Sequence, residues 1–98
     1  MDFILLMHND AKVDVAATGW QPYLHRLQMA GKLRGGSAIA GGTCFRREAQ
    51  PAPLTGEIVG FIRIEADDMI EAEGLLEGNP VYEAGGTVEV RMLPMTDG

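Results

Sequence analysis

Two histidines are the first candidates for acid–base chemistry, because an imidazole titrates near neutral pH. His8 follows the apolar run FILLM, so we expect it at the end of a strand. There it would act as a general base or polar anchor at the mouth of a pocket, or it would simply bond to water or a loop carbonyl. His25 would lie on the flank of a helix, in a ligand site or in solvent. The two cannot form a zinc centre alone, since an open site takes three protein ligands. We expect no cofactor.

Three charged residues form a second group of candidates on two predicted strands. Strand alternation places Arg63, Glu89 and Arg91 on the sheet face opposite the isoleucines of the third strand. The two arginines would form a clamp for an anion or carboxylate. Alternatively, an Arg–Glu–Arg network would stabilise a dimer, since a neutralising Glu is present.

Aromatic side chains offer a third possibility. Tyr23, Tyr82 and Trp20 could line a pocket for a planar ligand, although Trp20 and Tyr23 fit the core stripe of a helix equally well.

The glycine-rich run from Gly36 to Thr43 lacks the Lys of a phosphate loop, and we exclude nucleotide binding there. Ser37, within this run, remains a candidate pocket hydroxyl. Cys44 is the single cysteine, which excludes an internal disulfide. It is either a structural thiol or, beside Arg46 and Arg47, a reactive one.

Hydrophobic periodicity predicts the elements that position these residues. Strands are predicted over 2–8, 32–46, 57–65 and 86–93, and one helix over 19–30. Thr18 offers the N-cap of this helix, with Gln21 completing a capping box. A second helix is capped by Asp67 or Asp68 and ends at Gly78, Asn79 and Pro80. Residues 48–56 are predicted as a loop. The order is β-α-β-β-α-β.

This order is typical of a ferredoxin-like α+β fold, in which two helices cover one face of a four-stranded antiparallel sheet. The first strand is apolar on both faces, so the second sheet face must also be covered. In a short chain the cover is expected to be a second copy. We therefore predict a homodimer that packs face to face through its sheets.

Composition limits the classes of function. The 98 residues are 46% hydrophobic and 22% charged, which indicates one packed domain spanning 1–98. A net charge of −6 argues against non-specific nucleic-acid binding and against docking on an anionic membrane. We see no signal peptide and no run near the roughly 20 apolar residues of a membrane span. A lone cysteine fits a cytoplasmic location.

The chain also resembles a known family. The segment GFIRIEADDMIEAEGLLEGNPVYEAGGTVEVRML, residues 60–93, resembles the C-terminal half of YCII-related domains. These typically show a strand ending in Glu-Ala, an acidic helix start, an Asn-Pro or Asp-Pro turn, and a Gly-Gly-x-Val-Glu-Val-Arg strand. YLHRLQMAGKLRGGSAI, residues 23–39, resembles the family's first helix and second strand, and FILLMH its first strand. The resemblance covers most of the chain outside residues 44–58.

The resemblance implies a dimeric α+β barrel. Related barrels include isomerases, monooxygenases and lyases that work in a pocket between sheet and helices. YCII-related proteins often carry a His in the first helix and an Asp before a Pro-Tyr pair, proposed as a polar active pair. Here Tyr23 stands at the position of that His, and Asn79, near Tyr82, stands at the position of the Asp. Residues 54–57 stand where the DGPF subfamily has its Asp-Gly-Pro-Phe signature.

These observations lead to two hypotheses from different classes. In the first, the dimer binds a small organic metabolite, acidic or aromatic, in a pocket near Tyr23, His8 and Asn79, and acts as an acid–base lyase or isomerase without cofactor. In the second, it is a non-catalytic binding or regulatory module, linked to transcription regulation. The absence of the family's His and Asp favours the second, and the Tyr, His and Arg residues favour a ligand site of some kind.

Overall fold

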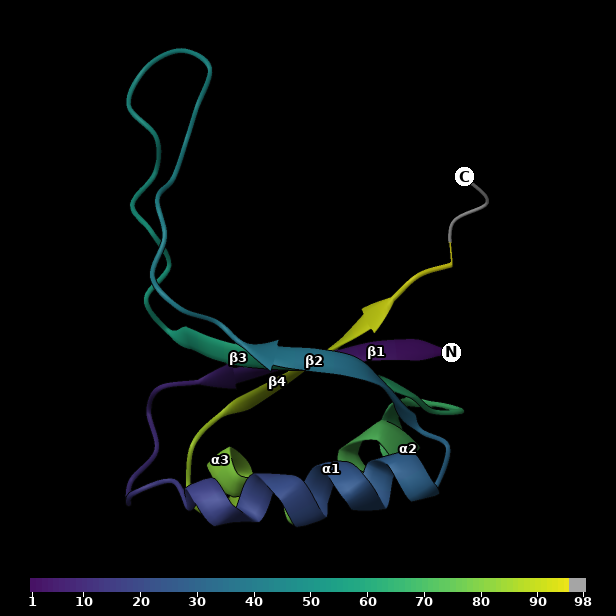
Figure 1. Cartoon of the computed structure of the whole chain (residues 1–98). Coiled ribbons are helices and arrows are strands. Elements are labelled where there is room, and N and C mark those ends of the chain that lie inside the picture. Colours follow the sequence, from purple (N-terminus) through teal and green to yellow (C-terminus); the bar gives the residue numbers. More distant parts are fainter. Residues whose placement is uncertain (96–98) are drawn as a thin grey trace.

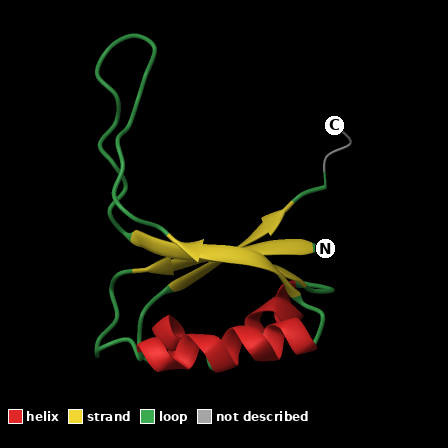
Figure 2. Cartoon of the chain, viewed as in Figure 1, coloured by secondary structure: helices red, strands yellow, loops and turns green. Residues whose placement is uncertain are grey.

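The computed structural model describes residues 1–95 as a four-stranded antiparallel sheet with its helices on one face (Figures 1 and 2). The strand order is β2-β3-β1-β4. The strands are β1 (Asp2–His8), β2 (Leu33–Ala38), β3 (Ile58–Glu65) and β4 (Val88–Leu93). The helices are the 3-10 turn η1 (Ala17–Gly19), α1 (Trp20–Met29), α2 (Met69–Gly74) and α3 (Pro80–Glu83). The predicted ferredoxin-like α+β fold is confirmed.

The core lies between the sheet and the helices, and strand alternation fills it. Phe3, Leu5 and Met7 of β1 are buried, and β3 adds Ile62 and Ile64 in register with them. Figure 1 shows α1, α2 and α3 on this side of the sheet. The prediction that the isoleucines of the third strand share one face is confirmed for Ile62 and Ile64, and this face is the one that packs against the helices.

The predicted strands are correct in number but differ in length. The first strand matches its predicted range, whereas β2 ends at Ala38 instead of continuing to Arg46. Close packing explains the glycine at the centre of β2: a Cβ on Gly36 would lie 2.6 Å from the carbonyl oxygen of Phe61. Only glycine lets β2 approach β3 this closely.

The start of α1 differs from the prediction. Thr18 is not an N-cap but lies within η1, and Gly19 occupies the cap position without a side-chain hydrogen bond. The 3-10 turn satisfies local backbone groups instead, because the N–H of Gly19 and that of Trp20 donate to carbonyls of the preceding turn.

The predicted second helix is in fact two short helices. Asp68 caps α2 as expected, accepting from the N–H of Glu71 at 2.8 Å, but α2 ends at Gly74. Gly78 adopts a φ of +88°, and Asn79 with Pro80 begins α3 instead of only ending α2. Pro is well suited to the first position of a helix, which explains why this turn starts one.

Between β2 and β3 the chain leaves the sheet as a long arm, residues 39–57, which contains no helix or strand. Figure 1 shows the arm rising from the side of the sheet that the helices do not cover. Within residues 1–95, no helix is long and apolar enough to cross a bilayer.

Candidate functional site

The sheet face away from the helices, called here the open face, carries most of the predicted charged candidates. Register places Arg63 and Arg91 on either side of Ile4, across β3, β1 and β4. In the next row, Phe61 and Glu89 flank Leu6 in the same way. The open face is therefore an apolar floor with charges on both sides. This confirms that Arg63, Glu89 and Arg91 share a face.

His8 lies at the end of β1, beyond this second row, and contacts Glu89. The Nε2 atom of His8 is 3.5 Å from Oε1 of Glu89, and the imidazole is about one-fifth exposed. Although this is ion-pair distance, Nε2 is shielded from water and makes no hydrogen bond within the described residues. A buried polar atom without a partner is unusual and calls for an explanation. The pair has the composition of an acid–base dyad, an imidazole beside an orienting carboxylate.

The two arginines differ in their partners. Nη1 of Arg91 lies 3.4 Å from Oε2 of Glu89, so Glu89 contacts both His8 and Arg91. Arg63 is exposed and takes part in none of the ion pairs found among residues 1–95. The predicted Arg–Glu–Arg network thus contains only one of its arginines within a single chain. Arg63 keeps its guanidinium available.

Ser37 is also on the open face. It pairs with Phe61 across β2 and β3, and its hydroxyl donates to the carbonyl of Ala38 at 2.8 Å. Its side chain is exposed, so the hydroxyl can rotate toward another acceptor.

Tyr23 and Asn79 lie on the other side of the sheet, within the helix layer. The Tyr23 hydroxyl donates to the carbonyl of Leu75 at 2.7 Å, which ties α1 to the turn after α2. Burial raises the pKa of the Tyr23 phenol, while the neighbouring Asn79 amide and Arg26 oppose this. The phenol therefore remains a proton donor at neutral pH.

Asn79 is fully buried and caps α3. Its Oδ1 accepts from the N–H of Val81 at 3.0 Å and from that of Tyr82 at 3.2 Å. Its Nδ2 has no hydrogen-bond partner among the described residues. The cap accounts for the hydrogen bonds of Oδ1, whereas the N–H groups of Nδ2 are not accounted for by it.

Arg26 adds a cation–π contact to the same cluster. Its guanidinium carbon lies 5.7 Å from the centre of the Tyr23 ring, and Nη2 donates to the carbonyl of Glu77. The contacts of Tyr23, Arg26 and Asn79 thus join α1 to the segment from Leu75 to α3.

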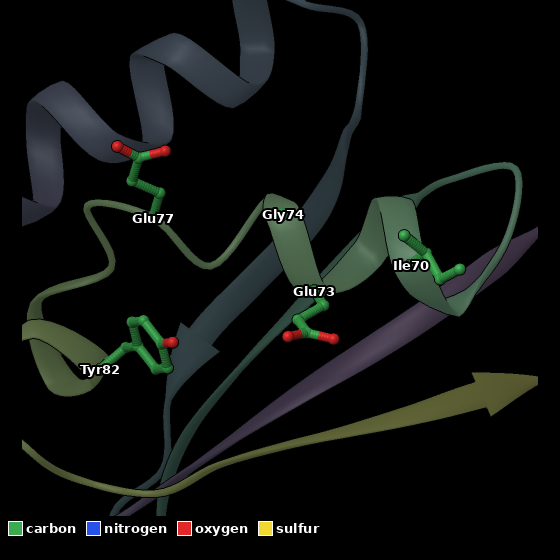
Figure 3. Close-up of a pocket in the computed structure, with 5 residues that line it drawn as sticks. All are labelled: Ile70, Glu73, Gly74, Glu77 and Tyr82. Atoms are coloured by element: carbon green, nitrogen blue, oxygen red, sulfur yellow. The ribbon is translucent and has the colours of Figure 1, made fainter.

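Tyr82 and His25 lie on the outside of the helix layer. His25 is exposed on α1. Tyr82 is half exposed and lines a hollow of about 390 Å³ between α2 and α3, together with Ile70, Glu73, Gly74 and Glu77 (Figure 3). The hollow contains two carboxylates and no basic group, so it suits a cation better than an anion.

The structure thus divides the predicted pocket into two groups. His8, Ser37, Arg63 and Arg91 share the open face, whereas Tyr23, Asn79, Tyr82 and His25 belong to the helix layer. The contact between His8 and Glu89 was not predicted. The strand order of a ferredoxin-like sheet could have indicated this contact, because it places the last strand beside the first. Among residues 1–95, no group of three His, Cys, Asp or Glu side chains is arranged to hold a metal ion.

Comparison with known proteins supports the fold. No protein-family model matches the chain, and no curated protein gives a significant sequence match. Among solved structures, the chain is similar to 5-chloro-2-hydroxyhydroquinone dehydrochlorinase from Burkholderia phenoliruptrix, solved in complex with 2,5-dihydroxybenzoquinone. The TM-score is 0.60 at 18% identity, over 98% of this chain and 96% of that one. At this identity the likeness extends to the ferredoxin-like α+β architecture, and the resemblance to YCII-related domains stays a prediction.

Proposed function

We propose that this chain is a homodimer that binds a small, oxygen-rich organic metabolite over its open face and catalyses a cofactor-independent acid–base reaction, an elimination or an isomerisation. The observation that carries this proposal is the dyad of His8 and Glu89 beside two arginines and an apolar floor. The similar solved structure is that of a dehydrochlorinase with a small ring bound, which supports the same class of ligand and reaction.

The dyad supplies the proton transfer. The Glu89 carboxylate, 3.5 Å from Nε2 of His8, orients the imidazole. The imidazole takes a proton from a substrate carbon or hydroxyl, the electron pair left behind forms a double bond, and a leaving group departs as an anion. In an isomerisation, the imidazolium instead returns the proton to a different carbon. Neither route consumes an oxidant or reductant.

The arginines and the floor bind the substrate. Arg63 and Arg91 flank Ile4, so a flat ring lying on Ile4 and Leu6 would place its oxygens within reach of both guanidinium groups. Positive charge on both sides stabilises an enolate or phenolate that forms during proton removal. This favours acidic hydroxylated rings over neutral or cationic ligands.

A second copy completes the pocket. Ile4, Leu6 and Phe61 remain only partly buried in the single chain, and the two hollows found among the described residues are lined by other side chains. A second sheet packed face to face would lie about 10 Å away where the side chains interdigitate, and farther away where a flat ligand separates the two faces. Covering the floor also removes water from the site, which strengthens the electrostatic contacts of the dyad.

Tyr23 and Asn79 take a positioning role in this proposal. They connect α1 to the α2–α3 segment and do not reach the open face. His25 and Tyr82, on the outer helix surface, are proposed to lie outside the metabolite site. These assignments differ from a single pocket that contains His8 and Tyr23 together.

The test is a thermal shift measurement with 2,5-dihydroxybenzoquinone as the probe, at several pH values between 5 and 8. A ligand that binds the folded protein raises its melting temperature by mass action. We expect a shift for the wild type, a smaller one for Arg63→Ala, and an unchanged one for the control His25→Ala. No shift with this probe or with a panel of hydroxylated aromatic acids would refute a metabolite site.

Turnover separates the two classes of function. The test substrate is 5-chloro-2-hydroxyhydroquinone, the compound in the name of the similar dehydrochlorinase, or a hydroxylated analogue. We expect His8→Ala to abolish its conversion and to retain ligand binding. Binding without any turnover by the wild type would instead favour the non-catalytic regulatory module.

A further inference from the structure

The arm, residues 39–57, is the largest feature that the proposed pocket does not use. It is a long segment without helix or strand in an otherwise compact domain. Such loops are uncommon, and those that occur are mostly functional or disordered. The arm is attached at its base, where Asn9 bonds to the carbonyls of Gly56 and Glu57 at 2.8 Å and Ile39 bonds to Val59 at 2.9 Å.

Above its base, the arm makes no hydrogen bond to any other part of the chain that the structure describes. Among the described residues, the hydrogen bond found above the base is internal, from Nη1 of Arg46 to the carbonyl of Gln50 at 3.3 Å. Three apolar side chains are exposed along the arm, with Phe45 at 90%, Leu54 at 52% and Ile39 at 43%. Exposure of a phenylalanine to this degree costs free energy unless a partner covers it.

We propose that the arm clasps a second copy of this chain and inserts its tip against the helix layer of that copy, between α2 and α3. This inference rests on the face-to-face dimer of the proposed function and names the segment that holds it together. The arm rises on the open-face side, which is where the second copy would sit (Figure 1).

The length of the arm fits this role. Each limb has about nine residues, which span up to roughly 30 Å when extended. The partner's sheet would lie about 10 Å away, and its helices, about 10 Å in diameter, would lie behind that sheet. The tip would therefore pass the edge of the partner's sheet and reach its helix layer.

Charge and shape favour the α2–α3 surface as the receiving site. The tip carries Arg46 and Arg47 directly after Phe45, whereas residues 66–86, which include α2 and α3, contain six acidic residues and no Lys or Arg. The hollow between α2 and α3 combines two carboxylates, Glu73 and Glu77, with the apolar Ile70 and the ring of Tyr82 (Figure 3). An aromatic ring followed by guanidinium groups complements such a surface. By two-fold symmetry each copy would give one arm and receive one.

The natural position of Cys44, one residue before Phe45, allows a direct test on the wild-type protein. We would attach a benzophenone maleimide to Cys44, irradiate an equal mixture of ¹⁴N and ¹⁵N protein, and locate the cross-links by mass spectrometry. We expect mixed-isotope cross-links to peptides within residues 66–86. A control with Cys44→Ser and His25→Cys places the same probe on α1 and should give few such products. Cross-links confined to single chains would overturn the proposal.

Dissociation constants from sedimentation provide the second test. We expect Phe45→Ser/Leu54→Ser to weaken the dimer at least about tenfold, and Met29→Ser, which removes an exposed side chain of α1, to leave it unchanged. We expect Arg46→Glu/Arg47→Glu and Glu73→Lys/Glu77→Lys each to weaken it, and the four substitutions together to restore much of the loss. If the arm substitutions leave the dissociation constant of the dimer unchanged, the clasp is refuted, whereas the proposed pocket between two sheets is not. A monomeric wild type refutes both.

Discussion

Replacing Tyr23 with phenylalanine tests whether this residue is structural or catalytic. Tyr23 is buried against the core, and its hydroxyl donates to the carbonyl of Leu75 at 2.7 Å. Phenylalanine keeps the ring, its contact with Trp20 and the cation–π contact with Arg26, so the substitution removes essentially one hydroxyl. The carbonyl of Leu75 then loses its side-chain donor in a partly buried position.

The expected cost follows from that lost bond. A buried acceptor left without a partner costs about 1–3 kcal/mol, and partial access of water to Leu75 favours the lower half of that range. For a domain of this size, 1 kcal/mol corresponds to a change in melting temperature of roughly 4–8 °C. We therefore expect Tyr23→Phe to lower the melting temperature by about 4–16 °C.

The assay is thermal unfolding for the melting temperature and urea unfolding for the free energy, both followed by circular dichroism at one fixed protein concentration, because the stability of a dimer depends on concentration. The control is Tyr82→Phe, which removes a half-exposed hydroxyl and should change the unfolding free energy by less than about 0.5 kcal/mol. Binding of 2,5-dihydroxybenzoquinone should be unaffected below the unfolding transition. If Tyr23→Phe were as stable as the wild type and lost binding or turnover, Tyr23 would belong to the active site, and the division between helix layer and open face would be wrong.

Two further predictions concern residues that hold the chain around the site. Asn79→Ala removes the cap of α3, so we expect a loss of about 0.5–2 kcal/mol in unfolding free energy, with Asn79→Ser recovering part of it as an alternative cap; equal stability of all three proteins would contradict this role. Hydrogen bonds from the hydroxyl and N–H of Thr87 lower the pKa of Asp10 from 3.8, so its carboxylate stabilises the folded state above that pH, and this contribution is lost as the pH falls through the lowered folded pKa. Asp10→Asn should therefore reduce the urea midpoint at pH 7 and have progressively less effect below about pH 4; a difference that did not depend on pH would show that the charge of Asp10 is unimportant.

Much of the fold could be predicted because it depends on local patterns. The apolar run of β1 and the alternation in β3 determine which side chains face the core, and both were readable from the sequence. The end of α2 was harder to predict. Gly78, Asn79 and Pro80 signal a helix end in the sequence, but only the packed structure shows that α2 already ends at Gly74 and that Asn79 caps a new helix, α3.

The division of the candidate site was partly readable as well. His8 has the same strand parity as Ile4 and Leu6, whereas the helices pack on the face of Leu5 and Met7. Parity alone therefore separates His8 from the helix residue Tyr23. The contact between His8 and Glu89 was different, because it depends on the register of β1 with β4, and no local pattern determines register between strands so far apart in the chain.

The open face and the arm point to the same requirement. A floor of partly buried apolar side chains lies beside the His8 imidazole, whose Nε2 makes no hydrogen bond within the described residues, and the arm next to it exposes apolar side chains of its own. Each of these features is unfavourable in an isolated chain, since apolar surface in water and a shielded imidazole without a hydrogen bond both cost free energy. A face-to-face dimer would cover the apolar floor, a bound metabolite would give the imidazole a hydrogen-bond partner, and a clasped second copy would cover the apolar side chains of the arm. Dimer formation and ligand binding would then depend on each other, because the surface that joins the two copies is also the surface that encloses the ligand.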